Sequence, residues 1–220
     1  MKAVITEQYG SPEVLQIKNI EKPTPKPNEV LIKIKATSIT AASAFMREGK
    51  PYFGRIFIGL TKPKTINPGT DLSGVIEAVG KNVTKFKTGD LVMAETGLDC
   101  GAYAEYVCLE EDELIVHQPD NISAEEATGI IDGACTALAF FTDQVKIKKG
   151  QKVLINGAYG GVGIFAIQIA KALGAKVTAV CSKNNHDMVL QLGADAAIDY
   201  RTQALTDLVE KFDIIYDVAV

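Results

Sequence analysis

The stretch "LINGAYGGVGIFAIQIAKALGAKVTAVCSKNN", residues 154–185, places a glycine-rich turn between two apolar runs. "KVLIN" (152–156) is typical of a buried strand, and residues 161–174 are predicted to form a helix that ends at a glycine. This strand–turn–helix order is the context that a phosphate-binding turn requires. The stretch therefore predicts a dinucleotide-binding βαβ unit. The alternative interpretation is a tight turn with a structural role only.

The glycines of "NGAYGGVG" (156–163) have distinct expected uses. Gly160 and Gly161 allow the backbone to approach a pyrophosphate without a Cβ clash, and Gly163 lets the helix pack close to the strand. The start of the helix adds N–H groups and a partial positive charge. Ala158 replaces the first glycine of the usual fingerprint, so the turn geometry is expected to differ slightly from that fingerprint.

The acidic residue that usually follows such a turn is missing. An Asp or Glu about 20 residues on would accept hydrogen bonds from the ribose 2′-hydroxyl. Here the second strand, "KVTAVC" (176–181), is followed by Ser182 and Lys183. A hydrogen bond to a charged group contributes about 1.5–3 kcal/mol, or about one to two powers of ten in affinity. Lys183 therefore predicts NADPH over NADH; the alternative is a solvated surface lysine.

Beyond residue 120 the sequence continues in the same pattern. "SAEE" (123–126) is a capping box that opens a helix, and we expect a second helical stretch at 133–146 and another at 187–193. Further strands are expected at 196–199 and 212–218. Strands that alternate with helices imply a parallel sheet covered on both faces. A full dinucleotide-binding sheet has six strands, and this sequence supplies about four. We therefore expect either that the chain is a fragment or that it completes its sheet in an unusual way.

The part of the chain before residue 120 predicts short strands separated by turns. "EVLIKIKA" (29–36) alternates between apolar residues and lysines, as a half-buried strand does. Similar runs occupy residues 73–80, 90–95 and 102–109. Strands at this spacing suggest a small β-barrel. We therefore expect two domains, residues 1–121 and 122–220.

Composition excludes several classes of protein. The 220 residues are 47% hydrophobic and 23% charged, as in ordinary globular proteins, and the net charge of −4 argues against a nucleic-acid partner. We find no secretory signal and no apolar window of about 20 residues, so no membrane partner is expected. The four cysteines are scattered, which predicts neither a disulfide framework nor a structural zinc site. The expected setting is a reducing cytoplasm.

Several motifs together carry a family resemblance. They are "MKAVI…YGSPEVLQI", "EKPTPKPNEVLIKIKA", "PGTDLSGVIEAVGKNVTKFKTGD", "GAYAEYV", the glycine-rich stretch and "LGADAAIDY". In colinear order over the entire chain, the sequence resembles the zinc-independent quinone oxidoreductases, the ζ-crystallin-like group of the medium-chain dehydrogenase/reductase superfamily. The resemblance implies an α/β fold: a GroES-like β-barrel catalytic domain (1–121) and a partial, doubly wound Rossmann sheet that binds NADP (122–220). Family members are longer, so the chain looks C-terminally truncated.

The resemblance also implies roles for residues of the cofactor site. The residues of "GGVG", Val162 included, carry the pyrophosphate. Ser182 and Lys183 occupy the 2′-phosphate positions, and Tyr200 lies beside the adenosine. Thr136 matches a threonine near the nicotinamide. The alternatives are that Tyr200 only caps a strand end and that Thr136 only bonds its own helix backbone.

In the catalytic domain, the resemblance places Tyr52 in the substrate cleft, where it is the candidate catalytic residue. The alternative is a packing residue in the apolar loop "PYFGRIFIGL" (51–60), which is itself either a lid or ordinary core.

The zinc alcohol dehydrogenases of the same superfamily are the competing interpretation. Their cysteine and His-Glu pair correspond here to Thr40, Thr70 and Asp71. One carboxylate cannot form a catalytic zinc site, which needs about three protein ligands. The two histidines, His117 and His186, are expected at the surface. No metal is therefore expected.

Without a metal, nothing here stabilises an alkoxide, whereas a conjugated carbonyl needs less assistance. The hypothesis is hydride transfer from NADPH to a quinone or α,β-unsaturated carbonyl, with Tyr52 as a donor to the substrate oxygen and water supplying the proton. The alternatives are a zinc-independent alcohol or aldehyde reductase and a non-catalytic NADPH-binding fragment. Family members commonly pair through the last strand of the nucleotide domain, so a homodimer is expected of a full-length form and doubtful for this chain.

Overall fold

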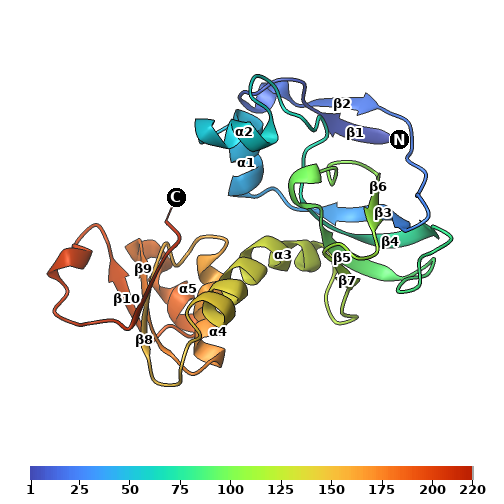
Figure 1. Ribbon diagram of the computed structural model, residues 1–220. Coiled ribbons are helices and arrows are strands. Elements are labelled where there is room, and N and C mark those ends of the chain that lie inside the picture. Colours follow the sequence, from blue (N-terminus) through green and yellow to red (C-terminus); the bar gives the residue numbers. More distant parts are fainter. Residues whose placement is uncertain (220) are drawn as a thin grey trace. The chain divides into compact units, whose positions relative to one another are not determined.

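The computed structural model describes residues 1–219 and divides into two compact units (Figure 1). Unit 1 is Met1–Ile131, and unit 2 begins at Asp132. The division lies inside helix α3 (Ala124–Ala139), somewhat further along the chain than residue 121. The expected α/β class is confirmed, with the antiparallel strands in unit 1 and the parallel strands in unit 2.

Unit 1 is built on a five-stranded antiparallel sheet in the order β6-β3-β4-β5-β7. A separate hairpin pairs β1 with β2. Buried branched side chains from β3, β4 and β5, among them Val30, Ile32, Leu72 and Val92, form its core. The strands are β1 (Lys2–Ile5), β2 (Gln16–Asn19), β3 (Glu29–Thr37), β4 (Asp71–Val79), β5 (Leu91–Glu95), β6 (Tyr106–Glu110) and β7 (Ile115–His117).

Two short α-helices of unit 1 lie between β3 and β4 in the chain. They are α1 (Ala41–Glu48) and α2 (Arg55–Ile58), and a 3₁₀ turn at Tyr52–Gly54 leads into α2. The predicted apolar loop 51–60 is therefore a 3₁₀ turn followed by a helical turn.

Unit 2 is a four-stranded parallel sheet in the order β10-β9-β8-β11. Apolar residues of β8, β9 and α4, with Phe141, form a second core. The elements are β8 (Lys152–Asn156), α4 (Gly163–Ala172), β9 (Lys176–Cys181), α5 (His186–Gln191), β10 (Ala196–Asp199) and β11 (Ile214–Asp217). Because β9 lies beside β8 and β11 lies on the other side of β8, the chain reverses direction across the sheet there. That reversal is where open α/β sheets place ligands.

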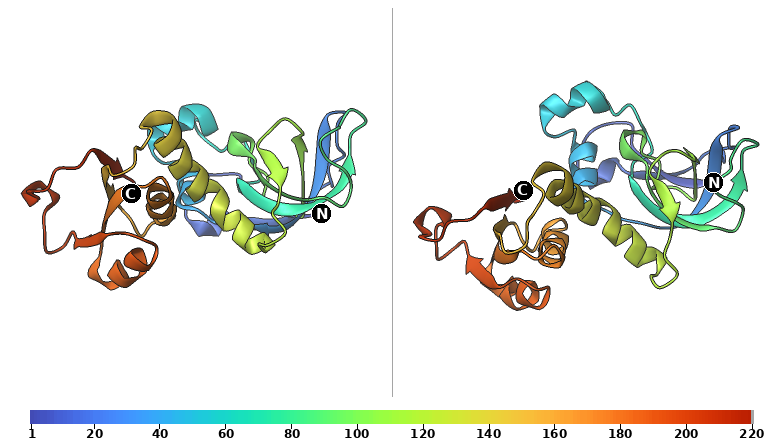
Figure 2. Two further views of the ribbon diagram at one scale, coloured as in Figure 1. Left: turned by 90° about the horizontal axis from the view of Figure 1, so that it is seen from below. Right: turned by 60° about the horizontal axis from the view of Figure 1, so that its bottom comes forward.

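The prediction of a separate helix at 133–146 is wrong. The capping box is present, since Ser123 and Glu126 exchange side-chain hydrogen bonds with each other's backbone N–H. One helix, α3, then runs on to Ala139 and into a π-helical turn (Phe140–Gln144), and Figure 2 shows it unbroken. Gly129 and Gly133 do not end it, because neither has a positive φ. Among residues 1–219 no helix is long and apolar enough to cross a membrane.

Asp195, directly before β10, links α4 to β9 through a contact that is sensitive to acid. Its carboxylate accepts hydrogen bonds from Lys171 Nζ on α4 at 2.8 and 2.9 Å and from the Val177 N–H on β9 at 2.6 Å. Burial disfavours the charged form, but these hydrogen bonds outweigh it, so the pKa of Asp195 lies below its usual value. A lowered carboxylate pKa contributes stability above the unfolded pKa of about 3.9, and this stability is lost as the pH falls through the folded pKa.

We expect Asp195→Asn to lower the free energy of unfolding at neutral pH by at most about 1 kcal/mol, because the carboxylate is 47% exposed and screened by solvent. The variant should also lose less stability on acidification below about pH 4 than the parent does. Urea unfolding over a pH series measures both effects. Identical pH dependence in the two proteins would contradict this role.

Candidate functional site

The glycine-rich turn begins at Gly157, directly after β8. Its φ is +75°, and a Cβ there would lie 2.8 Å from the Ala219 nitrogen. The Gly160 N–H donates to the Gly157 carbonyl at 2.9 Å, and the fully buried Ala158 donates its N–H to the Val180 carbonyl at 3.1 Å. Gly157 therefore supplies the left-handed turn residue, one position before Ala158. Sequence reasoning missed Gly157, although an Asn-Gly pair after a strand signals a turn.

Gly163 and Gly161 differ in what surrounds them. A Cβ on Gly163 would lie 2.3 Å from the Gly157 carbonyl oxygen and 2.7 Å from Ala158 Cα, so only glycine lets α4 start this close to β8. A Cβ on Gly161 would meet no atom within 4 Å. The turn is therefore closely packed at Gly163, against Gly157 and Ala158, and has open space beside Gly161. The first N–H groups of α4 cannot pair within the helix. That of Ile164 donates to the Gly160 carbonyl at 3.1 Å, and an anion in the open space can approach the N–H groups that precede it.

Helix α3 packs directly on this turn. A Cβ on Gly133 would lie 2.2 Å from the Gly161 carbonyl oxygen and 2.8 Å from Phe165 Cδ2. Thr136 is exposed and follows Gly133 by three residues, so it is a neighbour on the same side of the helix. The structure therefore brings Thr136 and the turn into one region of unit 2. Gly133 was missed in the sequence, where a glycine inside a helical stretch was the available signal.

Two glycines of α3 predict opposite effects of alanine on stability. We expect Gly133→Ala to destabilise the chain by about 1–3 kcal/mol, because the methyl group meets backbone at 2.2 Å. Gly129→Ala should stabilise it by about 1 kcal/mol, because no atom lies within 4 Å and alanine favours a helix. Thermal or urea unfolding measures both. Equal changes in the two variants would show that α3 does not pack on the turn in this way.

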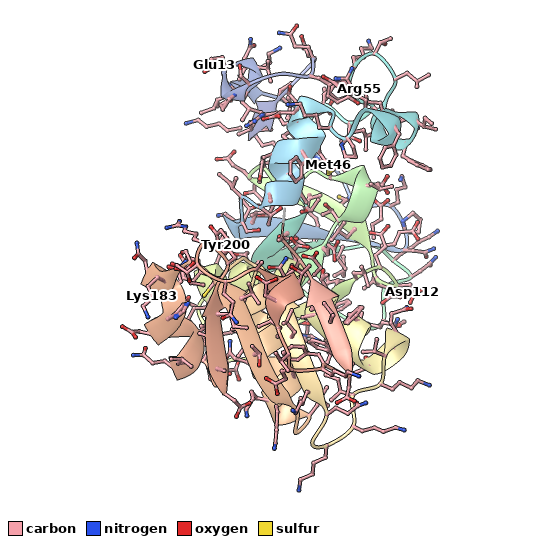
Figure 3. All side chains as sticks on the ribbon, turned by 90° about the vertical axis from the view of Figure 1, so that its left-hand side faces the viewer. Glu13, Met46, Arg55, Asp112, Lys183 and Tyr200 are labelled. Atoms are coloured by element: carbon pink, nitrogen blue, oxygen red, sulfur yellow. The ribbon has the colours of Figure 1, made fainter. Side chains whose placement is uncertain are left out.

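Ser182, Lys183 and Tyr200 lie at one edge of the sheet in unit 2. Cys181 and Asp199, the last residues of β9 and β10, are register partners. The residues that follow these parallel strands therefore lie side by side, and Figure 3 shows Lys183 and Tyr200 at the same margin of the unit. Lys183 is exposed and Tyr200 is 54% exposed, so both can contact a ligand.

The electrostatics of this edge include groups that sequence reasoning did not weigh. The Arg201 guanidinium lies 5.6 Å from the centroid of the Tyr200 ring and adds a cation beside that ring. The Asp199 carboxylate accepts the Arg201 N–H at 3.0 Å, so it is engaged within its own turn. Burial, with Asp199 nearby, raises the pKa of the Cys181 thiol, which keeps the sulfur uncharged. The edge can therefore accept an anion.

Tyr52 is an exposed residue of unit 1. Its side chain is 69% exposed, and the Arg55 guanidinium lies 5.0 Å from its ring centroid and 4.4 Å from that of Tyr9. Arg55 Nε donates to the Gly49 carbonyl at 2.9 Å, which fixes the cation between the two rings. This arrangement disfavours the interpretation of Tyr52 as a core residue. Tyr52 and the predicted cofactor residues lie in different units.

Unit 1 also contains a cavity of about 260 Å³. Most of its wall is apolar, and Arg47, Lys64 and Asp99 add charged groups. Tyr52 is not part of this wall. The other lining residues are Thr6, Tyr9, Met46, Phe57, Ile58, Pro63, Thr65, Pro68, Leu98 and Cys100.

The positions that would hold a catalytic zinc ion carry a hydrogen-bonded hydroxyl network instead. Thr40 caps α1 by accepting the Ser43 N–H at 3.2 Å. The Ser38 hydroxyl donates to the buried Asp71 carboxylate at 2.5 Å. Within residues 1–219, no three His, Cys, Asp or Glu side chains are close enough to hold a metal ion. These residues do not fit a zinc site.

The two histidines differ from each other. His117 is exposed as expected, with a side chain 59% accessible, and its ring lies 5.0 Å from that of Phe86. His186 is only half-exposed, and its Nε2 atom is buried without a hydrogen-bond partner among the described residues. The expectation of a surface histidine therefore holds for His117 but not for the Nε2 atom of His186.

The comparisons with known proteins agree over most of the chain. Residues 26–120 match the family "Alcohol dehydrogenase GroES-like domain" and residues 161–220 match "Zinc-binding dehydrogenase". Human quinone oxidoreductase is 34% identical over 214 residues, which are 96% of this chain and 62% of that protein. The chloroplastic NADPH-dependent alkenal/one oxidoreductase of Arabidopsis thaliana is 35% identical over 230 residues, 99% of this chain and 57% of that protein.

A solved structure matches as well. The quinone oxidoreductase from Coxiella burnetii aligns with a TM-score of 0.89 at 33% identity, covering 98% of this chain and 67% of that one. The chain thus spans about 60% of the length of the curated relatives it matches.

Proposed function

The chain belongs to the quinone oxidoreductase group of the medium-chain dehydrogenase/reductase superfamily, and from this premise we propose that it binds NADPH and reduces a quinone or an α,β-unsaturated carbonyl without zinc. The observation that carries the proposal is the pairing of an open glycine turn with a cationic strand edge in one unit. Gly161 leaves space in front of α4, and Lys183 follows the neighbouring strand. A pyrophosphate needs the open space at the glycine turn, and a 2′-phosphate needs the cation after the neighbouring strand.

We propose the following roles for residues of unit 2. Gly161, Val162 and Gly163 hold the pyrophosphate through backbone N–H groups at the start of α4, and Gly160, whose own N–H donates to the Gly157 carbonyl, lets the pyrophosphate approach the backbone. Lys183 pairs with the 2′-phosphate, and the Ser182 hydroxyl, which accepts a hydrogen bond from Asn185 Nδ2 at 3.1 Å, lies beside it.

Two further residues complete the proposed cofactor site. The exposed ring of Tyr200 covers the adenosine. Thr136, on the face of α3 that contacts the turn, positions the nicotinamide. When bound, NADPH supplies the hydride; the chain's residues bind and orient it.

Tyr52 is the proposed donor in unit 1. Hydride addition to a conjugated carbonyl places negative charge on the carbonyl oxygen, and a hydroxyl donor lowers the energy of that charge. Tyr52 presents an exposed phenol on a segment fixed by Arg55. We retain residues 1–121 as the catalytic domain and 122–220 as the NADP-binding domain. No disulfide joins the cysteines of the described residues, which suits the reducing cytoplasm that we propose as its setting.

The test is NADPH oxidation, followed by absorbance, with 1,4-benzoquinone, an aliphatic enone and a simple aldehyde as separate substrates. We expect turnover with the quinone or the enone. Turnover with the aldehyde alone would favour the alcohol or aldehyde reductase alternative. NADPH binding without any turnover would favour the non-catalytic alternative.

Tyr52→Phe tests the donor separately. We expect kcat to fall by about tenfold, since a partly solvated donor contributes less than the 10²- to 10³-fold of a buried one. The Kd for NADPH should not change, because Tyr52 lies in the other unit. An unchanged kcat would remove Tyr52 from the mechanism.

A further inference from the structure

Arg55 lies between two tyrosine rings of unit 1. Its guanidinium carbon is 4.4 Å from the centroid of the Tyr9 ring and 5.0 Å from that of the Tyr52 ring. A cation within about 6 Å of an aromatic ring is attracted by the negative face of that ring. Arg55 is therefore attracted to both rings at once. These three side chains are here called the Arg55 clamp.

The end of α1 holds the cation of the Arg55 clamp. Arg55 Nε donates to the Gly49 carbonyl at 2.9 Å, and Arg55 Nη2 donates to the Glu48 carbonyl at 3.3 Å. Both carbonyls lie at the C-terminal end of α1, beside α2 (Figure 1), where carbonyls lack partners within the helix and a cation is favoured. Gly49 has φ +64°, and a Cβ there would lie 2.6 Å from Arg55 Nε and 2.8 Å from the Tyr9 ring. Gly49 therefore leaves the space that the clamp fills.

The two tyrosines of the Arg55 clamp differ in what their hydroxyls do. Tyr9 is half-buried, and its hydroxyl donates to the Gly59 carbonyl at 2.6 Å. Burial, opposed by the charge of Arg55, raises the pKa of the Tyr9 phenol, so this donor stays protonated. Tyr52 is 69% exposed, and its hydroxyl has no hydrogen-bond partner among residues 1–219. Tyr9 therefore anchors the clamp, whereas the Tyr52 hydroxyl is available to a ligand.

We propose that Arg55 is a positioning residue for Tyr52, which it holds in one orientation with a positive charge on the face of the ring. An exposed side chain without such a contact exchanges between rotamers, and a hydrogen-bond donor contributes most to catalysis when it is already in place. The charge of Arg55 also favours negative charge that develops on an oxygen bound to the Tyr52 hydroxyl. The role rests on the proposed hydride transfer, in which Tyr52 is the donor.

Lys50 is a second cation near Tyr52 and provides the matched control. The Glu48 carboxylate, 3.0 Å from Lys50 Nζ, is the main cause of the raised pKa of Lys50, and Tyr52 is a minor cause. Lys50 stacks on no ring among residues 1–219. Lys50→Met therefore removes a nearby charge and leaves the clamp intact, whereas Arg55→Met removes the clamp itself.

The kinetics of NADPH oxidation with an aliphatic enone test the role in the 220-residue chain. Arg55→Met should lower kcat by roughly fivefold and leave the KM for the enone unchanged, because the donor acts on charge that appears only in the transition state. In a chain that already carries Tyr52→Phe, Arg55→Met should lower kcat by less than about twofold, since its effect passes through the missing hydroxyl. Lys50→Met should change kcat by less than about twofold in the parent chain.

The loss should also depend on the acceptor. Hydride addition to an aliphatic enone leaves most of the charge near one oxygen, whereas the anion of a reduced quinone spreads its charge over an aromatic ring. The more localised charge gains more from a positioned donor. Arg55→Met should therefore lower kcat more with the enone than with 1,4-benzoquinone. A purely structural role of Arg55 would lower both rates equally.

NMR of the guanidinium protons tests the clamp without turnover. Their resonances should be displaced upfield by the ring currents of Tyr9 and Tyr52. Tyr52→Leu, a change at an exposed side chain, should remove part of that displacement, and Lys50→Met should leave it unchanged.

Two outcomes would overturn the role of Arg55 alone. One is an equal loss of kcat from Arg55→Met in the parent chain and in the Tyr52→Phe chain. The other is a guanidinium resonance that Tyr52→Leu does not move. A parent chain that turns over neither acceptor would overturn the proposed function, and the role of Arg55 with it. The Kd for NADPH should be the same in all these proteins, because Arg55 lies in unit 1.

Discussion

Replacing Lys183 by glutamate is expected to weaken NADPH binding by at least about a hundredfold while changing NADH binding little. The lysine contributes a hydrogen bond to a charged group, about one to two powers of ten in affinity, and the glutamate adds repulsion of the 2′-phosphate. Lys183 is exposed directly after β9, so the substitution should not disturb packing. Calorimetric titration with each dinucleotide measures the change.

Lys176→Gln is the matched control, because Lys176 is an exposed lysine at the amino end of the same strand. It should leave both affinities unchanged, whereas Lys183→Gln should weaken NADPH binding by about tenfold. If Lys183→Glu bound NADPH as tightly as the parent, the 2′-phosphate would have to bind elsewhere. Arg201, near the Tyr200 ring, would then be the next cation to replace.

Gly161→Ala is expected to weaken NADPH and NADH equally, by at least about tenfold, without loss of stability. The added methyl group meets no protein atom within 4 Å, so the fold accepts it. It occupies the open space in front of the turn, where the pyrophosphate that both dinucleotides share is expected to bind. Parallel calorimetry and thermal unfolding separate the two effects.

Gly163→Ala provides the opposite case within the same turn. Its methyl group would lie 2.3 Å from the Gly157 carbonyl oxygen, so the backbone must shift, and unit 2 should lose about 1–3 kcal/mol of stability. A Gly161→Ala protein with unchanged affinity for both dinucleotides would show that the open space is not the phosphate site.

The sheet of unit 2 was predictable because its signals are local. The runs at 152–156, 176–181 and 196–199 form β8, β9 and β10 with the same bounds. Apolar runs bounded by glycines and polar residues give strands without reference to the rest of the chain. The helix α3 was divided wrongly, because the reason for Gly133 is a contact with Gly161, which lies far away in the sequence.

The candidate site was predictable only in part, because local signals can be read in the sequence and contacts between distant residues cannot. Lys183 was found because a strand end and a missing acid can be seen in the sequence. Gly157 was missed although the Asn-Gly pair after β8 is a local signal of a turn, and its close contact with the chain near Ala219 is visible only in the structure. The exposure of the large apolar side chains in 52–60 could not be predicted either, since one contact that holds this segment comes from the distant Tyr9. Apolar content alone does not distinguish a lid, a core segment and a docking surface.

The most direct test of the account is a pair of calorimetric titrations of the 220-residue chain, one with NADPH and one with NADH. Our account predicts that NADPH binds more tightly by about one to two powers of ten, and that Lys183→Gln removes most of this difference. Equal affinities for the two dinucleotides in the parent chain would contradict it.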